Sequence, residues 1–278
     1  MSPAPHADAH VHLFREGFAG ETGGSPAGAD EVAVYERLRL HHGIERSLVL
    51  GYEGDRRYAG NSADVLSLAQ RHAWIVPLVY LRHAPAPQPS TLKDYAERGA
   101  AGFALYADDA HEGRALVEWP DLVLDELQRQ RAMISVNAAP ETLAAMRPFI
   151  HRLDACTVII SHLGSPPRCP TPPGIAHARE LLEPLLRLAT GPHVRVKFSG
   201  LYAISDPSHN FPHTSAKPFL DLVLERFGPS RLLWGSDFPP ALDYVSFVQL
   251  LDTRLLAGCS GAEIEGVMGA NLLRLLDA

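Results

Sequence analysis

The 278-residue sequence contains few cysteines and few lysines, and it lacks any long apolar run. The three cysteines, Cys156, Cys169 and Cys259, are scattered and odd in number, which fits a reducing compartment better than a disulfide framework. No run approaches the roughly 20 apolar residues of a membrane span, and the first residues have neither the basic nor the apolar region of a signal peptide. We therefore expect a cytoplasmic protein with no membrane partner.

Positive charge is also scarce. The net charge is −7, and the isoelectric point is near 6.0. With no basic run, these values argue against a nucleic-acid partner. Only Lys93, Lys197 and Lys217 are lysines, so each one is of interest. No change of composition, repeat or low-complexity segment divides the chain, and we expect residues 1–278 to form a single domain.

Histidine and aspartate side chains stand at the ends of three apolar runs. Asp8-Ala9-His10-Val11-His12 closes the first run, and alternation along a strand predicts that Asp8, His10 and His12 share one face. His162 ends a later run, and Asp237 ends the last one. Imidazole and carboxylate groups can converge on one ion or one substrate carbonyl. The three run ends therefore predict one assembled site.

Apolar runs alternate with amphipathic segments along the whole chain. Eight strands with intervening helices in about 250 residues predict an α/β fold, a closed (β/α)8 TIM barrel. An open doubly wound sheet is the alternative, but the sequence lacks its G-x-G-x-x-G turn after an early strand. We expect strands over residues 5–14, 46–51, 74–81, 101–106, 132–137, 156–162, 193–199 and 231–237. We expect helices over residues 31–42, 61–72, 90–99, 116–131, from 140, 175–188, 218–227, 244–256 and 262–276. The expected N-caps of the first three are Asp30, Asn61 or Ser62, and Ser90.

The active site of such a barrel lies at the carboxyl ends of the strands. The seventh expected strand supports this placement because its apolar residues alternate with Arg195, Lys197 and Ser199. Helices cover the outside of a barrel, so the polar face is expected in the lumen. The candidate residues at strand ends are His10, His12, Tyr106, Asn137, His162, Lys197, Ser199 and Asp237.

Four motifs occur in a recognisable order. D-A-H-V-H, S-H-L-G-S-P, V-K-F-S-G-L-Y and W-G-S-D-F-P, followed by residues 269–275, resemble the amidohydrolase superfamily over nearly the whole chain. Within its amidohydrolase-2 branch of lactone hydrolases and non-oxidative decarboxylases, the chain is most similar to the 2-pyrone-4,6-dicarboxylate lactonase and sugar-lactonase group. The resemblance implies a barrel, hydrolysis at a carbonyl and often a divalent ion.

The resemblance implies His10, His12 and Asp237 as ligands of a divalent metal, with zinc the expected ion. Three protein ligands and a water molecule are typical of catalytic zinc. Metal-dependent members commonly supply a further His or a modified Lys from a middle strand, where this chain has Asn137. A metal-independent site is therefore equally consistent with the sequence.

Lactone hydrolysis requires an activated water and a place for an oxyanion. We predict that Asp237 is the general base and that His10, His12 and His162 polarise the ring carbonyl. The alternative for Asp237 is a helix cap, and for His162 it is a buried side chain bonded to backbone.

The expected substrate is a small anionic or polyhydroxylated molecule. Lys197 in a lumen requires an anionic partner, either a substrate carboxylate or Asp237. For the loop residues Arg168, His209 and His213, a solvated surface role is the favoured alternative. The full set of predicted substrate contacts is Tyr106, Asn137, Arg168, Lys197, Ser199, His209 and His213.

Two other functions remain open at this point. A metal-dependent decarboxylase of the same branch would use the same strand ends with a firmly bound ion. A catalytically silent barrel that binds a small ligand is the other, although the intact H-x-H and G-S-D-F-P motifs argue against it. The sequence leaves the oligomeric state open, and a homo-oligomer is compatible with it.

Overall fold

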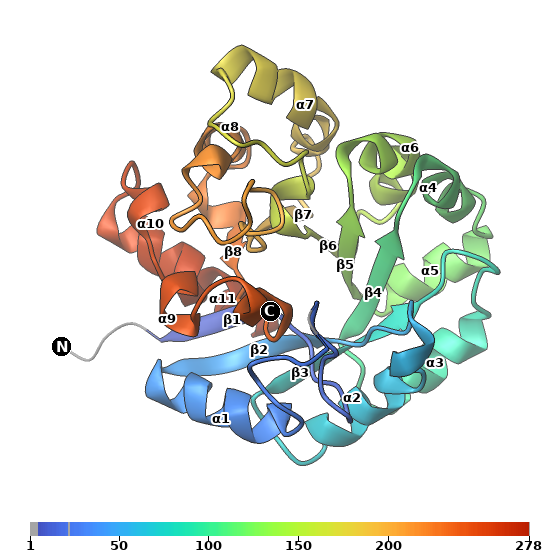
Figure 1. Cartoon of the computed structure of the whole chain (residues 1–278). Coiled ribbons are helices and arrows are strands. Elements are labelled where there is room, and N and C mark those ends of the chain that lie inside the picture. The colour runs from blue at the N-terminus through green and yellow to red at the C-terminus, as the bar shows by residue number, and fades with distance from the viewer. Residues whose placement is uncertain (1–4, 22, 278) are drawn as a thin grey trace.

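Eight parallel strands form one sheet in the order β1 to β8 (Figure 1). The computed structural model describes residues 5–21 and 23–277. The chain after β8 pairs with β1: the Asp237 amide donates to the His10 carbonyl at 2.8 Å, and the His12 amide donates to the Phe238 carbonyl at 2.7 Å. These bonds close the ring and confirm the predicted (β/α)8 barrel.

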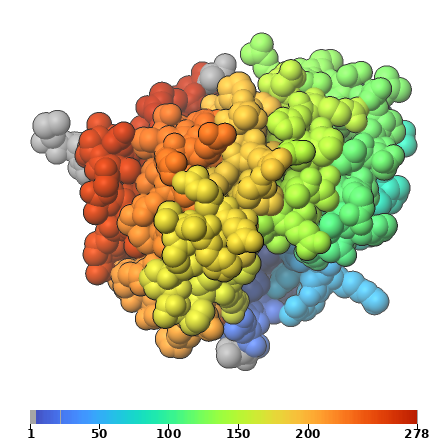
Figure 2. Space-filling view, turned by 90° about the horizontal axis from the view of Figure 1, so that it is seen from above, coloured from blue at the N-terminus to red at the C-terminus, as the bar shows by residue number. Residues whose placement is uncertain are grey.

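The helices surround the strands, and α6, α7 and α8 pack successively around the barrel (Figure 1). In the space-filling view, yellow-green, yellow and orange segments of the chain adjoin one another (Figure 2). The strands are β1 (His6–Val11), β2 (Ile44–Leu50), β3 (Ile75–Leu81), β4 (Gly102–Ala107), β5 (Met133–Ala138), β6 (Thr157–Ile160), β7 (Val194–Phe198) and β8 (Leu232–Trp234). The helices are α1 (Glu31–His41), α2 (Asn61–Ala69), α3 (Pro89–Glu97), α4 (Ala110–Val117), α5 (Asp121–Arg129), α6 (Pro140–His151), α7 (Ile175–Leu188), α8 (Lys217–Phe227), α9 (Phe247–Leu250), α10 (Gly261–Glu265) and α11 (Asn271–Leu276). None of these described helices is long and apolar enough to cross a membrane.

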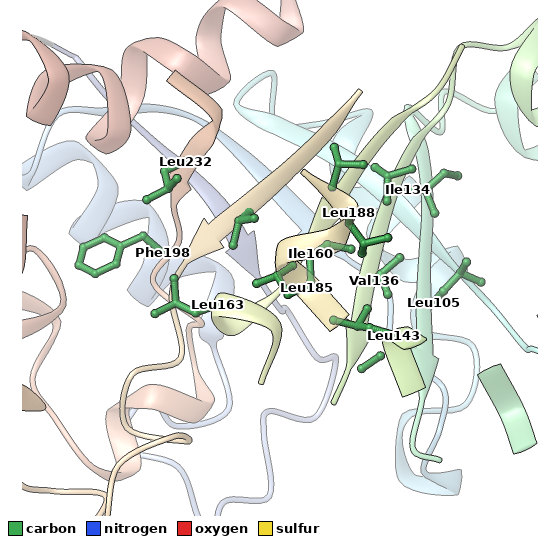
Figure 3. Close-up of a cluster of buried hydrophobic side chains, with 14 of the residues drawn as sticks. Leu105, Ile134, Val136, Leu143, Ile160, Leu163, Leu185, Leu188, Phe198 and Leu232 are labelled. Carbon is green, nitrogen blue, oxygen red and sulfur yellow. The ribbon is translucent and has the colours of Figure 1, made fainter. Parts of the chain in front are cut away.

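The main apolar core lies between the strands and the helices. Val136 of β5 and Ile160 of β6 belong to one buried cluster with Leu143 of α6 and Leu185 of α7 (Figure 3). Burying a side chain of this kind stabilises a fold by roughly 1.5–3 kcal/mol. This layer fixes the helices on the barrel and leaves the lumen for a different set of residues.

A second, smaller apolar cluster fills the lumen below the carboxyl ends of the strands. Ala104 of β4 and Ile159 of β6 belong to it. Two residues farther along the chain from each are Tyr106 and Ser161, which contact histidines. The polar site therefore lies on an apolar floor.

The β1 strand contains a bulge that the sequence did not predict. Asp8 pairs with Ser47 and Val11 pairs with Val49. Between these two pairs, β1 advances by three residues while β2 advances by two. An extra residue in one strand reverses which face the following side chains occupy.

This bulge makes the prediction of a shared face wrong for Asp8. Its carboxylate points toward the helices, where the Tyr35 hydroxyl of α1 donates to Oδ2 at 2.8 Å. The amides of His10 and Ser236 donate to the other oxygen at 3.0 and 2.9 Å. Asp8 thus joins the backbone of β1 to the segment after β8, while His10 and His12 line the lumen cavity.

Proline breaks one predicted helix in two. Residues 116–131 were expected as one helix, but α4 ends at Val117 and α5 begins after Pro120, which is its N-cap. A proline lacks the amide that a helix interior needs, so the chain restarts there. The predicted helix over 244–256 is also wrong, because α9 covers only Phe247–Leu250 and a 3-10 turn follows.

The predicted helix starts are partly confirmed. The Asp30 side chain accepts from the Ala33 amide at the start of α1, as expected. Instead of Asn61 or Ser62, Gly60 is the N-cap of α2. The predicted cap at Ser90 is wrong because α3 begins one residue earlier, at Pro89.

Candidate active site

A cavity of about 420 Å³ opens at the carboxyl ends of the strands. Its size is typical of a small-molecule site. The residues that line it are His10, His12, Phe14, Phe18, Tyr52, Tyr58, Tyr106, Asn137, His162, Ser165, Tyr202, Ala203, Asp237 and Pro240.

The three predicted strand ends meet in this cavity around Asp237. His10 Nε2 lies 3.4 Å from Asp237 Oδ1, and His162 Nε2 lies 3.8 Å from Oδ2. His12 Nε2 lies 3.2 Å from His10 Nε2. All four side chains are buried. Barrel closure brings together groups that are more than 200 residues apart.

Hydrogen bonds outside the cluster orient the imidazole rings. His12 Nδ1 lies 3.0 Å from the Leu50 carbonyl, which only accepts, so Nδ1 donates and Nε2 keeps its lone pair. The Tyr106 hydroxyl, 3.3 Å from that Nε2, is placed to donate to it. His162 Nδ1 lies 3.1 Å from Ser199 Oγ. Such partners fix both the tautomer and the direction of each ring.

Lys197 is fully buried beneath His10. Its Nζ donates to Ser135 Oγ at 2.7 Å and lies 3.1 Å from His10 Nδ1. Of the described residues, these two are its hydrogen-bond partners, and the predicted pairing with Asp237 is not a direct contact. Burial lowers the pKa of Lys197 to about 7, against the opposing influence of Asp237. Both the charged and the neutral amine are therefore accessible near neutral pH.

Asp237 is held by a residue that the sequence reasoning did not select. The Tyr202 hydroxyl donates to Asp237 Oδ2 at 2.7 Å. Tyr202 is the last residue of the V-K-F-S-G-L-Y motif, and its place in that motif could have identified it from the sequence. Asp237 and His162 both adopt left-handed backbone angles, with φ of 57° and 52°. Such conformations are uncommon outside glycine and are concentrated at functional sites.

Two glycines leave room for the imidazole rings. A Cβ on Gly200 would lie 2.2 Å from His162 Nδ1, and φ there is +61°. A Cβ on Gly235 would lie 2.8 Å from the Cβ of His10. Neither space can accommodate a larger residue without moving a histidine.

Burial keeps the cluster histidines neutral. It lowers the pKa of His12 to about 4, partly opposed by Asp237. Burial likewise lowers the pKa values of His10 and His162. Neutral imidazoles serve as metal ligands or hydrogen-bond partners, but they provide no positive charge for an anion.

The cluster fits a divalent metal ion. The ligand atoms of His10, His162 and Asp237 all lie within 4.8 Å of one another. Zinc bonds of about 2.0–2.1 Å in a tetrahedron place neighbouring ligand atoms about 3.4 Å apart, close to the distances here. The ligand set His10, His12 and Asp237 stays a prediction, since His162, and not His12, completes this group of described residues.

His10 fits a metal only in one tautomer. A charged Lys197 donates to Nδ1 and leaves a hydrogen on Nε2, which then cannot bind a metal. A neutral Lys197 amine accepts from Nδ1 and frees Nε2. The pKa of about 7 makes both states accessible near neutral pH.

The predicted substrate contacts lie in different places. Tyr106 and Asn137 line the cavity, as expected. Ser199 and His213 line a second, smaller cavity. Arg168 is exposed, and its Nε donates to the Ala203 carbonyl at 3.0 Å. His209 is exposed as well. These positions favour the surface alternative for Arg168 and His209, whereas His213 is buried.

The sequence reasoning also missed an aromatic wall. Phe14, Phe18, Tyr52 and Tyr58 line the cavity, and they come from segments that follow β1 and β2. Because they follow predicted strands, their positions could have identified them as cavity residues from the sequence. Aromatic residues are so often core residues that this signal did not single them out.

The sequence matches a known protein family and a known relative. A family profile described as amidohydrolase matches residues 7–278. The L-fucono-1,5-lactonase of Burkholderia ambifaria is 29% identical over 210 residues, which cover 73% of this chain and 68% of that protein.

Solved structures are similar over the full length. A probable 2-pyrone-4,6-dicarboxylic acid hydrolase from Acinetobacter baumannii with citric acid bound has a TM-score of 0.76 at 15% identity, covering 98% of this chain and 99% of that one. An amidohydrolase from Burkholderia multivorans with bound zinc has a TM-score of 0.72 at 22% identity, covering 98% of both chains. At these identities the likeness shows the fold.

Proposed function

Because the chain belongs to the amidohydrolase family, a family of hydrolases, we propose that it opens the ring of a small lactone. The observation that carries this proposal is the Asp237 carboxylate, held between two neutral histidines at the wall of a substrate-sized cavity. The lactonase activity named for the Burkholderia ambifaria relative supports the same reaction class.

Asp237 acts as the general base. Its carboxylate removes a proton from a water molecule, and the resulting hydroxide attacks the lactone carbonyl carbon. The tetrahedral intermediate collapses by breaking the ring C–O bond. The proton held by Asp237 then passes to the alkoxide, and the product is an open-chain hydroxy acid. Tyr202 keeps the carboxylate oriented through its 2.7 Å hydrogen bond.

The histidines have unequal roles in this proposal. His12 donates from Nδ1 to Leu50, so its Nε2 has no hydrogen to give to an oxyanion. His10 carries a hydrogen on Nε2 when Lys197 is charged, and it then supplies a donor to the carbonyl oxygen. This assignment refines the expectation that all three histidines polarise the carbonyl.

Zinc is the proposed cofactor of the metal-bound form. His10, His162 and Asp237 would hold it, with His12 beside them. A bound zinc ion supplies an acidified water and a Lewis acid for the carbonyl. The zinc in the Burkholderia multivorans structure supports this choice of ion.

The proposal is tested with the full chain and a panel of lactones in a pH-indicator assay. We expect Asp237→Asn to fold normally and to lose turnover by about 10³-fold or more, because the base is gone and the shape is kept. Circular dichroism and thermal unfolding check the fold. Turnover close to that of the unchanged protein would remove Asp237 as the base.

The metal is tested in the same assay with chelator-treated and zinc-supplemented protein. Turnover restored by zinc, together with one bound zinc by elemental analysis, supports the metal-bound form. Turnover that survives chelation in metal-free protein supports Asp237 and the histidines acting alone. Carbon dioxide release from carboxylated substrates, with every lactone left intact, would replace the proposal by the decarboxylase alternative.

A further inference from the structure

The smaller cavity has a volume of about 30 Å³ and adjoins the polar cluster of the main site. Ser199 and Tyr202 both line it. Ser199 is the hydrogen-bond partner of His162, and the Tyr202 hydroxyl donates to Asp237. A buried water molecule needs about 10–15 Å³ of space, so this cavity has room for about two of them.

His213 lines the same cavity and is 5% exposed. Neither of its ring nitrogens has a hydrogen-bond partner among the residues that the structure describes. Burial lowers the pKa of His213 to about 4, so the ring is neutral near pH 7. A neutral imidazole has one nitrogen that donates and one that accepts. Buried groups of this kind are nearly always paired, with protein or with ordered water, because an unpaired one is costly.

The backbone around His213 holds the residue in a tight turn. Its amide donates to the Asn210 carbonyl and its carbonyl accepts from the Ala216 amide, each at 2.9 Å. Its φ of 62° is left-handed, which is uncommon for a residue with a Cβ. The Phe211 ring lies perpendicular to the imidazole, with centroids 6.3 Å apart. Such a conformation persists where the surroundings stabilise it, and the cavity is where partners for the ring can lie.

The lining of the small cavity also includes half-buried polar residues. Gln249 of α9 and Asp252 line it, and both are partly exposed, so water can enter from the surface. Apolar side chains such as Trp234 and Leu255 also line it. A water molecule there needs at least two polar partners. His213 can provide one of them, and the buried Ser199 hydroxyl can provide another.

Ser199 has a hydroxyl hydrogen whose direction decides the tautomer of His162. Its partner among the described residues is His162 Nδ1, at 3.1 Å. A hydroxyl that donates to Nδ1 leaves the imidazole hydrogen on Nε2. A hydroxyl that donates into the small cavity instead accepts from Nδ1–H. His162 Nε2, which lies 3.8 Å from Asp237 Oδ2, then keeps its lone pair.

From these contacts we infer that the small cavity is a binding site for water, held between His213 and Ser199. The water accepts the Ser199 hydrogen, and Ser199 accepts from His162 Nδ1. His213 is therefore a positioning residue: through water and Ser199 it keeps His162 Nε2 free to bind a metal or to accept a hydrogen bond. This inference goes beyond the proposed lactonase function and does not depend on it.

The tautomer is measured in metal-free protein labelled with ¹⁵N in its histidines. Nuclear magnetic resonance distinguishes a ring nitrogen that carries hydrogen from one that does not, and loss of signals in His162→Gln assigns that ring. We expect the hydrogen on Nδ1 of His162. His213→Leu removes both ring nitrogens, and we expect the hydrogen of His162 to move to Nε2 in at least part of the molecules.

Two further variants control for a structural effect. His213→Gln keeps a donor and an acceptor in the cavity, so it should restore hydrogen on Nδ1 of His162. His209→Leu replaces an exposed histidine of the same loop and should leave the tautomer unchanged. An unchanged tautomer in His213→Leu overturns the positioning role. The Ser199 backbone, which raises the pKa of His162, would then be what fixes the ring.

Zinc affinity gives a second measurement that needs no substrate. Partners of metal-binding histidines typically contribute 10–100-fold to metal affinity. We expect His213→Leu to weaken zinc binding by about tenfold or more in a competition with a chelating dye. His213→Gln should stay within about threefold of the unchanged protein, and His209→Leu should match it. Equal affinities in the Leu and Gln variants of His213 would contradict the inference.

The presence of water is tested by thermal unfolding and by crystallography. Leu and Gln share the left-handed backbone at position 213, so a difference in Tm reports their side chains. With water bound, His213→Gln should have the higher Tm. In a dry cavity His213→Leu would have it, because an apolar group then replaces an unpaired one. A crystal structure of the unchanged protein should show water bonded to His213 and Ser199, and a dry cavity overturns the inference. Failure to hydrolyse any lactone overturns the proposed function alone.

Discussion

At the scale of single residues, the position of the Asp237 carboxylate depends on one tyrosine. The Tyr202 hydroxyl donates to Oδ2, and its ring stacks on Tyr244 with centroids 4.7 Å apart. Both tyrosines belong to loops, and stacking fixes the ring that carries the donor. A hydrogen bond to a charged group is worth about 1.5–3 kcal/mol. Tyr202 is therefore a positioning residue for the proposed base.

The Tyr202→Phe substitution removes this donor and keeps the ring. We expect kcat to fall about tenfold with little change in KM, because the carboxylate loses its orientation and substrate contacts remain. Tyr244→Phe is the matched control, since it keeps the stacked pair and leaves the Asp237 hydrogen bond intact. Equal kcat values for the two variants would contradict this role of Tyr202.

At the scale of elements, the first turn of α1 holds the loop that carries half of the aromatic wall. The buried Glu31 carboxylate accepts from the Phe14 and Phe18 amides at 2.7 and 2.5 Å. Burial raises the pKa of Glu31 to about 7, against the effect of these two amides. The charged carboxylate offers an acceptor to both amides at once.

Replacing Glu31 by Gln keeps the size of the side chain but puts an NH₂ group against one amide. We expect the free energy of unfolding to fall by about 1–3 kcal/mol. KM for a hydrolysed lactone should rise severalfold, because the wall loosens, with a smaller effect on kcat. Urea unfolding and steady-state kinetics measure both effects.

Glu36→Gln, farther along α1, is the control for this substitution. Glu36 pairs with Arg39 near the surface, away from the loop. Surface pairs contribute about 0–1 kcal/mol, so this variant should keep its KM. If both variants have the same KM, Glu31 does not position the wall.

At the scale of the whole molecule, the closed barrel removes a lysine from water. Lys197 is completely buried, and its pKa of about 7 compares with about 10.4 for an exposed lysine. Below pH 7 the lysine is charged in the folded protein, and the free-energy penalty of burying that charge is fully present. As the pH rises above 7, the folded lysine loses its proton while the unfolded one keeps it, so this penalty declines.

The free energy of unfolding should therefore rise between pH 7 and pH 8 by up to ~1.4 kcal/mol through Lys197. Above pH 8.5 the unfolded Cys156 thiol begins to ionise, whereas burial raises its folded pKa to about 12, and this opposes the rise. Urea titrations at several pH values measure the slope. The Lys197→Met variant should not show this rise in the free energy of unfolding between pH 7 and pH 8. An equal slope in that variant would mean that other groups cause the rise.

Short-range patterns were sufficient to predict the barrel and to place four candidate site residues together. The period of two in the strands, the polar residues at their ends and the order of the motifs placed His10, His12, His162 and Asp237 at one edge. In a parallel barrel all carboxyl ends meet, so position along each strand already implies proximity.

Tertiary contacts decided the rest. The bulge in β1 turned Asp8 toward Tyr35, and no local pattern of the sequence encodes that register shift. No local pattern predicts the contacts of Lys197 either, because its partners Ser135 and His10 come from other strands. The aromatic side of the cavity likewise formed only when the segments after β1 and β2 brought their rings to the site. Burial and pairing depend on residues distant in the chain, so they become defined only when the ring of strands closes.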